Sequence, residues 1–211
     1  MKRLVIVGAG GYGREMCGAA CAGRLLGIES FAVKGFLDDN PHALDGFADC
    51  PPILGSLAGY APQADDVFIT AFGNLATRRR AVETLAAKGA AFATLVATSA
   101  FLGPRVTVGA GSFIAPGVAL TADIRIGRHA AVFHNTSIGH DAVLGDFCHV
   151  YAQCSLGGAV KVGDGAQVFP GAVVVPRRTI GAGATVGAGS TVVLNVEPGV
   201  TVFGSPAAPV T

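Results

Sequence analysis

Residues 126–150 read IGRHAAVFHNTSIGHDAVLGDFCHV, and within this stretch every sixth residue is aliphatic. The same register runs without interruption from Leu102 to Val192. Glycine often follows the aliphatic residue directly, and a small residue often stands four places after it. A hexapeptide repeat of this kind is typical of a parallel β-helix.

The length of the repeat explains why it folds in this way. Six residues at about 3.3 Å each make one short face and a corner, so three faces close a triangular coil of about 18 residues. We expect the aliphatic residues to stack inward from coil to coil, and the small residues to permit the tight corners. A β-sandwich would instead show irregular turn spacing and slips of phase. The sequence therefore predicts an all-β helix over residues 98–197, followed by a C-terminal tail over 198–211.

The first 97 residues follow a different pattern, in which apolar runs alternate with helix-forming stretches. Alternating strands and helices indicate a small parallel sheet of the Rossmann type. We therefore predict an α/β domain over residues 1–97. Its expected elements are strands at 4–7, 31–37, 67–72 and 92–96, and helices at 14–26 and 75–88.

A glycine-rich turn follows the first predicted strand. Gly8, Gly10 and Gly13 match the G-x-G-x-x-G pattern, and Asp38 and Asp39 come about 25 residues later. This arrangement binds phosphates at a helix N-terminus and a ribose hydroxyl at a carboxylate. Three interpretations remain: a site for a nucleotide-linked ligand, a dehydrogenase, or a turn that only joins strand to helix. A dehydrogenase normally needs a larger fold than this region offers.

Composition limits the partners. Hydrophobic residues make up 51% of the chain and charged residues 14%, which is typical of repeats that also contact sister subunits. The net charge is +1, and we interpret the basic run 78–80 as a solvated helix face, so neither nucleic acid nor an anionic membrane is an expected partner. The chain shows no signal peptide and no 18-residue apolar stretch, which predicts a cytoplasmic protein. Five cysteines without zinc spacing predict reduced thiols, with Cys148 and Cys154 as core residues.

His140 is the strongest candidate for acid–base chemistry, because Asp141 stands directly beside it. A carboxylate fixes the tautomer of an imidazole and raises its basicity, as a general base near neutral pH requires. His134 occupies the equivalent slot of the preceding hexapeptide, and the sequence assigns it no role.

The whole chain resembles the hexapeptide-repeat acyltransferases with a left-handed β-helix. It is most similar to the subgroup of sialic-acid O-acetyltransferases and nucleotide-amino-sugar N-acetyltransferases. The segments that carry the resemblance are Gly8 to Gly13, Phe36 to Asp39, Phe72 to Asn74, Ile138 to Asp141, Gly145 to Val150 and Val202 to Ala207. Two departures stand out: relatives often carry His-Pro where residues 96–100 read VATSA, and no long loop interrupts the repeats.

The resemblance implies a mechanism. His140 is the general base that takes a proton from the sugar amine or hydroxyl as it attacks the thioester of acetyl-CoA, and Asp141 raises its basicity. The tetrahedral oxyanion needs a donor, for which the backbone N–H of Gly157 or Gly158 is the candidate, because consecutive glycines let the main chain approach a ligand closely.

The resemblance also implies a homotrimer, with acetyl-CoA lying along the β-helix between subunits and no metal. The residues expected near the cofactor are His149, Gly158, Pro170, Gly187 and Ala188. The residues expected to hold the nucleotide-linked amino sugar are Gly10, Gly11, Tyr12, Asp38, Asp39 and Gly73.

The leading hypothesis is an N-acetyltransferase that acts on a nucleotide-linked amino sugar in glycan or surface-polysaccharide synthesis. O-acetylation of a sialic-acid-type sugar is the alternative within enzymes. A non-catalytic trimeric scaffold is a third possibility. A β-helix carbonic anhydrase would need three histidines around a metal, for which His134, His140 and His149 are the candidates, but neither the N-terminal domain nor the tail fits that class.

Overall fold

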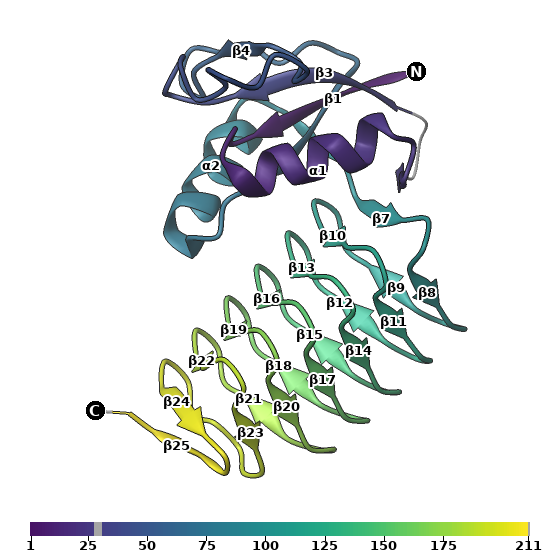
Figure 1. Ribbon diagram of the computed structural model, residues 1–211, viewed down its shortest axis with the longest axis vertical. Helices are drawn as coiled ribbons and strands as arrows, with labels where there is room; N and C mark the ends of the chain where they lie inside the picture. Colours follow the sequence, from purple (N-terminus) through teal and green to yellow (C-terminus); the bar gives the residue numbers. More distant parts are fainter. Residues whose placement is uncertain (28–30, 211) are drawn as a thin grey trace. The chain divides into compact units, whose positions relative to one another are not determined.

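The computed structural model describes residues 1–27 and 31–210, which form two compact units, Met1–Leu95 and Val96–Thr211 (Figure 1). The fold class is the one predicted: a small parallel α/β sheet followed by a left-handed parallel β-helix. The first compact unit ends at Leu95, two residues before the end of the predicted domain 1–97. The functional limits of the predicted domains stay a prediction.

The N-terminal unit is a five-stranded parallel sheet in the order β4-β3-β1-β5-β6, accompanied by two helices. The predicted helices and the first three predicted strands are present. The predicted strand 92–96 is instead two short strands, β6 (Ala91–Phe92) and β7 (Leu95–Ala97), which belong to different sheets. The short strands β2 and β4 were not indicated by the sequence pattern. The helix α1 ends at Cys21 rather than at residue 26, because Gly23 adopts a φ of +65° that a helix cannot continue through. The elements are β1 (Lys2–Val7), α1 (Gly11–Cys21), β2 (Leu25–Gly27), β3 (Phe31–Leu37), β4 (Ile53–Gly55), β5 (Asp66–Thr70), α2 (Leu75–Ala87) and β6 (Ala91–Phe92).

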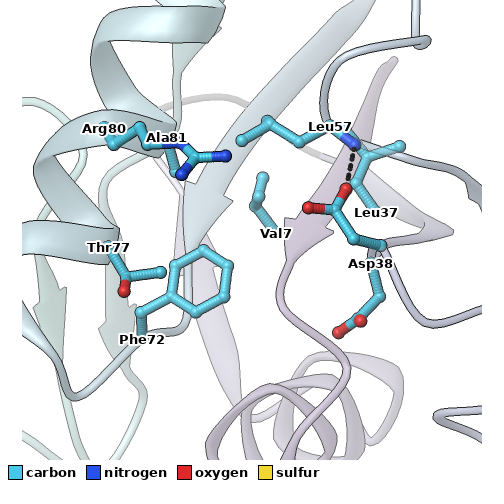
Figure 2. Close-up of a pocket in the computed structure, with 9 residues that line it drawn as sticks. Val7, Leu37, Asp38, Leu57, Phe72, Thr77, Arg80 and Ala81 are labelled. Atoms are coloured by element: carbon cyan, nitrogen blue, oxygen red, sulfur yellow. Dashed lines mark hydrogen bonds between the residues drawn. The ribbon is translucent and has the colours of Figure 1, made fainter.

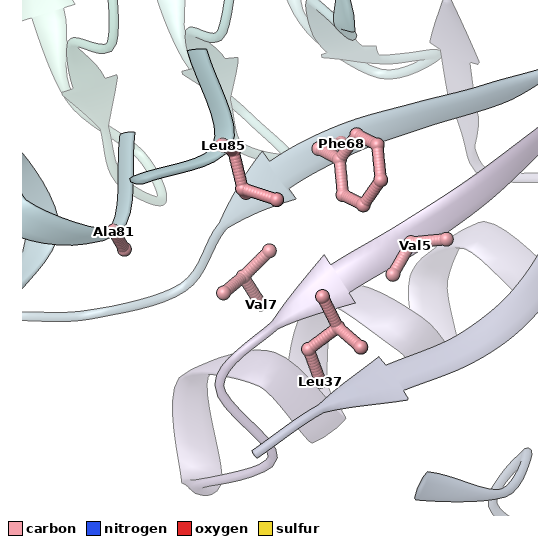
Figure 3. Packing of buried hydrophobic residues seen from close by; sticks show 6 residues of the cluster. All are labelled: Val5, Val7, Leu37, Phe68, Ala81 and Leu85. Atoms are coloured by element: carbon pink, nitrogen blue, oxygen red, sulfur yellow. The ribbon is translucent and has the colours of Figure 1, made fainter. Parts of the chain in front are cut away.

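One part of the core of this unit lies between the sheet and α2, and Met16 and Cys17 of α1 are buried as well. Figure 3 shows Val5 and Val7 of β1 and Phe68 of β5 together with Leu85 of α2. These side chains are at most 1% exposed, so each removes its full apolar surface from water. The central runs of β1 (Leu4–Val7) and β5 (Val67–Ile69) are apolar at every position, because parallel strands in such folds are buried on both faces.

A charged cluster lies at the start of β5. The Asp66 carboxylate, buried in the fold, accepts hydrogen bonds from Lys34 Nζ at 2.8 Å and from the Tyr60 hydroxyl at 2.7 Å. The backbone N–H of Gln63 donates to the same carboxylate at 3.0 Å. Burial alone would raise the pKa of Asp66, but these donors outweigh it and hold that pKa below its ordinary value.

The second unit consists of short strands on three faces. Partners are 18 residues apart, as in Phe113 with Ala131, so each coil pairs with the next in strict register. The three parallel sheets run β7-β10-β13-β16-β19-β22-β24, β8-β11-β14-β17-β20-β23 and β9-β12-β15-β18-β21, and β25 adds an antiparallel edge to β24 (Figure 1). The strands are β7 (Leu95–Ala97), β8 (Phe101–Leu102), β9 (Thr107–Val108), β10 (Phe113–Ile114), β11 (Ala119–Leu120), β12 (Arg125–Ile126), β13 (Ala131–Val132), β14 (Ser137–Ile138), β15 (Val143–Leu144), β16 (His149–Val150), β17 (Ser155–Leu156), β18 (Lys161–Val162), β19 (Gln167–Val168), β20 (Val173–Val174), β21 (Thr179–Ile180), β22 (Thr185–Val186), β23 (Thr191–Val192), β24 (Thr201–Gly204) and β25 (Ala207–Pro209).

The interior of the coils is a set of aliphatic stacks. The repeat residues from Ile114 to Val192 are at most 4% exposed, and Cys148 and Cys154 fill small-residue positions in the same core, as predicted. Leu102 is 37% exposed because the first coil has no preceding coil to cover it. Each coil therefore depends on its neighbours for burial, as in other solenoids.

The corners are turned by residues that are often not glycine. Arg105, Asp123, Asp141, Ala159 and Arg177 occupy one corner of successive coils, with φ between 58° and 63°. The glycines after the aliphatic residues serve a different purpose from the predicted one. A Cβ on Gly139 would lie 2.5 Å from the Gly158 nitrogen of the next coil, so these glycines permit close approach between coils.

Candidate active site

His140 lies at the corner that follows β14. Its Nδ1 is 2.7 Å from Asp141 Oδ2, and the two side chains are 70% and 62% exposed. Asp141 has a φ of 60°, a conformation that aspartate tolerates better than most residues. The Nδ1 contact leaves Nε2 as the nitrogen available to a substrate, so the ring is oriented for proton transfer on its far side.

Gly158 lies beside this imidazole, one coil further along the chain. A Cβ at Gly158 would be 2.7 Å from His140 Nε2, which means that only glycine leaves the space beside that nitrogen open. The backbone fixes the relation of the two coils, because Ala159 N donates to the His140 carbonyl at 2.7 Å. Gly157 N donates to the Val174 carbonyl at 2.9 Å. Of the two candidate oxyanion donors, Gly157 is therefore committed to the fold.

The residues predicted to contact the cofactor occupy different places within the β-helix. Pro170 and Ala188 are exposed at a second corner, where the Gly189 N–H donates to the Pro170 carbonyl at 2.9 Å. Gly187 gives room to Phe203, since a Cβ there would be 2.2 Å from that ring. One chain thus brings Gly158 next to His140, but it holds Pro170 and Ala188 at another corner.

His149 lies in an aromatic cluster on the face of β13 and β16. His149 is 1% exposed. Its ring packs edge-on against Phe133 and against Tyr151, with 5.5 Å between the ring centroids in each pair. Tyr151 in turn stacks between Phe133 and Phe169, at 5.3 and 4.8 Å. The contact of His149 with the cofactor stays a prediction.

The glycine turn of the N-terminal unit is shaped by close backbone contacts. A Cβ at Gly13 would lie 1.9 Å from the Gly8 carbonyl oxygen, so glycine is required where α1 passes the end of β1. Asp38 stabilises the same turn, because Oδ2 accepts the Ala9 N–H at 2.8 Å and Oδ1 accepts the Asn40 N–H at 2.9 Å.

The N-terminus of α1 lies immediately after this turn. Gly10 is the N-cap and makes no side-chain cap, Gly11 begins the helix, and Tyr12 is half-buried in the first turn. The first N–H groups of a helix have no intrahelical partner and favour an anionic ligand. Gly73 is exposed just before Asn74, which caps α2 through a 2.9 Å bond from the Thr77 N–H.

A cavity of about 210 Å³ opens beside Asp38 and Asp39. Figure 2 shows Arg80 and Thr77 of α2 on the opposite side of this cavity from Asp38, with Phe72 and Val7 between them. The sequence patterns did not single out Thr77, Arg80 or Leu57 as site residues. Thr77 and Arg80 are three residues apart, so they share one face of the helix that follows Gly73, and this spacing could have indicated that both line the same site. The basic run is also not uniformly solvated, because Arg78 is 2% exposed.

The loop on the far side of the cavity is fixed by two contacts. Leu57 N donates to Asp39 Oδ1 at 3.2 Å. Lys88 Nζ, just after α2, donates to the carbonyl oxygens of Leu57, Ala58 and Tyr60 at 3.0, 2.6 and 2.8 Å. The pocket walls are thus held by charge-assisted bonds.

Among the described residues, 1–27 and 31–210, no three side chains of His, Cys, Asp and Glu come together as a group that could hold a metal ion. Over the same residues, no helix has both the length and the apolar character needed to cross a bilayer.

Comparison with known proteins gives consistent results. Residues 3–85 match the PglD N-terminal domain family. Perosamine N-acetyltransferase from Caulobacter crescentus, solved with CoA and GDP-perosamine as a variant with histidine changed to asparagine, superposes with a TM-score of 0.88 at 28% identity, covering 100% of this chain and 98% of that one. The acetyltransferase domain of PglB from Neisseria gonorrhoeae, solved with acetyl coenzyme A, gives 0.87 at 28%, covering 99% of both chains. WeeI from Acinetobacter baumannii gives 0.85 at 28%, covering 100% of both. No curated protein sequence matches at a comparable level.

The hexapeptide β-helix, the His140–Asp141 pair at its corner and the N-terminal domain together define an acetyltransferase. This class is the one the sequence predicted. Over its whole length the chain is similar to hexapeptide-repeat acetyltransferases, among them perosamine N-acetyltransferase and the PglB acetyltransferase domain.

Proposed function

We propose that this protein transfers the acetyl group of acetyl-CoA to the amine of a nucleotide-linked amino sugar. The observation that carries the proposal is the His140–Asp141 pair, whose imidazole Nε2 lies beside Gly158, a residue with no side chain. The similar structures with CoA, acetyl coenzyme A and GDP-perosamine support the choice of donor and acceptor class.

The positions of His140 and Asp141 suit direct acetyl transfer. The sugar amine attacks the thioester carbon, and a new C–N bond forms as the carbonyl oxygen becomes an oxyanion. His140 Nε2 takes the proton that the amine loses, and Asp141 stabilises the resulting imidazolium through Nδ1. The oxyanion then re-forms the carbonyl as the C–S bond breaks, and the CoA thiolate leaves and takes the proton from the His140 imidazolium, which restores the base. Attack is direct, so no covalent intermediate with the protein is formed.

The oxyanion needs a hydrogen-bond donor placed where its charge develops. We assign this role to the backbone N–H of Gly158, because the Gly157 N–H is already bonded to Val174. The absence of a side chain at Gly158 lets the acyl group approach the main chain beside His140.

The N-terminal unit supplies the nucleotide site. The phosphates lie at the N-terminus of α1, over Gly10, Gly11 and Tyr12, where the helix dipole favours negative charge. Both oxygens of Asp38 accept backbone N–H groups, so Asp38 shapes the turn, whereas Asp39 keeps acceptor capacity for a ribose hydroxyl or a base N–H. Gly73 lies two residues before α2 and directly after Phe72, which lines the cavity.

The remaining assignments extend the same proposal. The active assembly is a homotrimer in which acetyl-CoA lies between subunits and contacts His149, Pro170, Gly187 and Ala188. The reaction takes place in the cytoplasm and serves surface-polysaccharide synthesis. No metal takes part.

The first test is thiol release from acetyl-CoA with UDP-, GDP- and dTDP-linked amino sugars and with free sialic acid as acceptors. Release with one nucleotide-linked amine is expected, and it identifies the acceptor. Release with free sialic acid alone would replace the proposal by O-acetylation. His140→Asn keeps a similar shape without the base, and it should lose at least about 100-fold in kcat. Unchanged turnover in this variant would reject the catalytic assignment.

A further inference from the structure

The cavity of the N-terminal unit lies at the carboxyl ends of β1 and β3, where open parallel sheets bind ligands. Its floor is apolar and buried, and it consists of Val7, Leu37 and Ala81, each at most 1% exposed. The ring of Phe72 adds an aromatic side wall. A flat heteroaromatic ring suits such a floor, because burial of its faces removes apolar surface from water.

One wall of the cavity presents a carboxylate with unused acceptor capacity. Asp39 Oδ1 accepts the Leu57 N–H at 3.2 Å, and Oδ2 accepts no hydrogen bond from residues 1–27 and 31–210. Asp38 differs, since each of its oxygens accepts a backbone N–H. An ionised carboxylate can only accept hydrogen bonds. Asp39 therefore selects a ligand edge that carries donors.

The opposite wall presents a cation. Arg80 of α2 is exposed, and Figure 2 shows its guanidinium directed into the cavity. Within the part of the chain that the structure describes, this guanidinium makes neither a hydrogen bond nor an ion pair, with Asp39 or with any other residue. Opposite charges attract each other at short range, but α2 and the end of β3 hold these two apart. A ligand that bridges them must donate hydrogen bonds at one edge and accept them at another.

We propose that this cavity binds a guanine base, and that Arg80 and Asp39 determine this choice. Guanine carries two donors side by side, N1–H and the N2 amino group, which meet the Asp39 carboxylate. Its O6 and N7 acceptors lie together on the adjoining edge, and they match the two parallel N–H groups of an arginine. The inference rests on the proposed function, because it names the nucleotide of the amino-sugar acceptor as guanosine diphosphate.

The other bases fit these two walls less well. Uracil and thymine have one N–H, which lies between two carbonyl acceptors that repel a carboxylate. Adenine and cytosine have one amino group beside a ring nitrogen that accepts, so they also offer Asp39 a single donor. Thr77 does not discriminate among the bases, because its hydroxyl both donates and accepts.

The test measures binding of GDP, UDP, ADP and dTDP to the full chain by isothermal titration calorimetry, without acetyl-CoA. GDP should bind at least about tenfold more tightly than each of the others. Two analogues probe the two edges of the base separately: 7-deaza-GDP lacks the N7 acceptor, and inosine diphosphate lacks the N2 amino group. Each should bind about tenfold more weakly than GDP, because it leaves a charged side chain without one partner.

Variants assign each edge to its residue. Arg80→Met keeps a side chain of similar length without donors, so it should weaken GDP binding and remove the difference between GDP and 7-deaza-GDP. The difference between GDP and inosine diphosphate should persist in this variant, and it should disappear in Asp39→Asn. Arg79→Met is the matched control, because Arg79 is an exposed arginine of the same helix that does not line the cavity. It should bind GDP as the wild type does.

Tighter binding of UDP, ADP or dTDP than of GDP would overturn the inference, and so would the absence of binding by all four. Equal affinities of GDP and 7-deaza-GDP in the wild type, or equal effects of Arg80→Met and Arg79→Met, would remove Arg80 from the base site. The proposed function is judged separately, by thiol release from acetyl-CoA. GDP binding without release by any amino-sugar acceptor would reject acetyl transfer and leave the base assignment standing.

Discussion

The proposed oxyanion site depends on the absence of a side chain at Gly158. Gly158→Ala would place a Cβ 2.7 Å from His140 Nε2, in the space proposed for the amine and the oxyanion. We expect kcat to fall by about 100-fold or more, as for the loss of an oxyanion donor, with thermal unfolding little changed. Ser155→Ala, an exposed change in the same coil, should keep full activity in the same steady-state assay. Near-normal turnover in Gly158→Ala would rule out the assigned oxyanion site.

A substitution at Gly13 tests whether close packing of α1 against the end of β1 requires glycine there. Gly13→Ala places a Cβ 1.9 Å from the Gly8 carbonyl oxygen and should destabilise the N-terminal unit by about 2 kcal/mol or more. Gly18→Ala is the matched control in the same helix, because no atom lies within 4 Å of its added Cβ. That change should stabilise by about 0.5–1 kcal/mol. Urea denaturation measures both, and equal stability of the two variants would contradict the packing argument.

Asp66 gives the N-terminal unit a defined acid sensitivity. Its folded pKa lies below the ordinary value, so its contribution to stability is fully present above about pH 5 and is lost as pH falls below about 4. Asp66→Asn should cost on the order of 2 kcal/mol at pH 7, because it leaves Lys34 without its charged partner.

Urea denaturation at pH 7 and near pH 3.5 checks the pH dependence, since the gap between wild type and Asp66→Asn should narrow in acid. Asp65→Asn serves as control, because the Asp65 carboxylate is 48% exposed and pairs with Arg3 at the surface. Its cost should stay below about 0.5 kcal/mol. A gap that is constant with pH would show that the Asp66 carboxylate does not act through its charge.

At the scale of elements, periodic burial was predictable and conformational detail was not. The two-residue strands of the β-helix follow directly from the six-residue register, because each inward residue must meet its counterpart 18 positions away. The edge strand β4 is too short to show a pattern. The reason for the repeat glycines also escaped prediction, because contact between coils 18 residues apart is not visible in a local turn rule.

The site was predictable to the extent that neighbours in sequence are neighbours in space. His140 and Asp141 are adjacent, so their contact followed from the sequence. The choice of Gly158 over Gly157 required the hydrogen bond that commits Gly157 to Val174. Arg80 lines the cavity although it is exposed, and a local charge pattern could not indicate this, because Asp38 and Asp39 on the other side of the cavity are about 40 residues away in the sequence.

At the scale of the whole molecule, the register of 18 residues limits which deletions the β-helix tolerates. Deletion of residues 159–176 removes one full coil and joins Gly158 to Arg177, which has the same corner conformation as Ala159. We expect a folded, less stable protein with cooperative urea unfolding. Deletion of residues 159–175 shifts all later residues by one and turns their aliphatic side chains outward. Far-ultraviolet circular dichroism should show loss of structure only in the second variant, and equal spectra would refute the register argument.

The aromatic column of Phe133, Tyr151 and Phe169 also allows the unfolding of the β-helix to be followed by tyrosine fluorescence. The chain has no tryptophan and three tyrosines, of which Tyr12 and Tyr60 belong to the N-terminal unit and Tyr151 to the β-helix. Tyr151→Phe keeps a ring in the column yet silences the phenol emission of the β-helix. The remaining fluorescence then reports on the N-terminal unit alone. The difference between the wild type and this variant reports on the β-helix, so the unfolding of each unit can be followed without an attached dye.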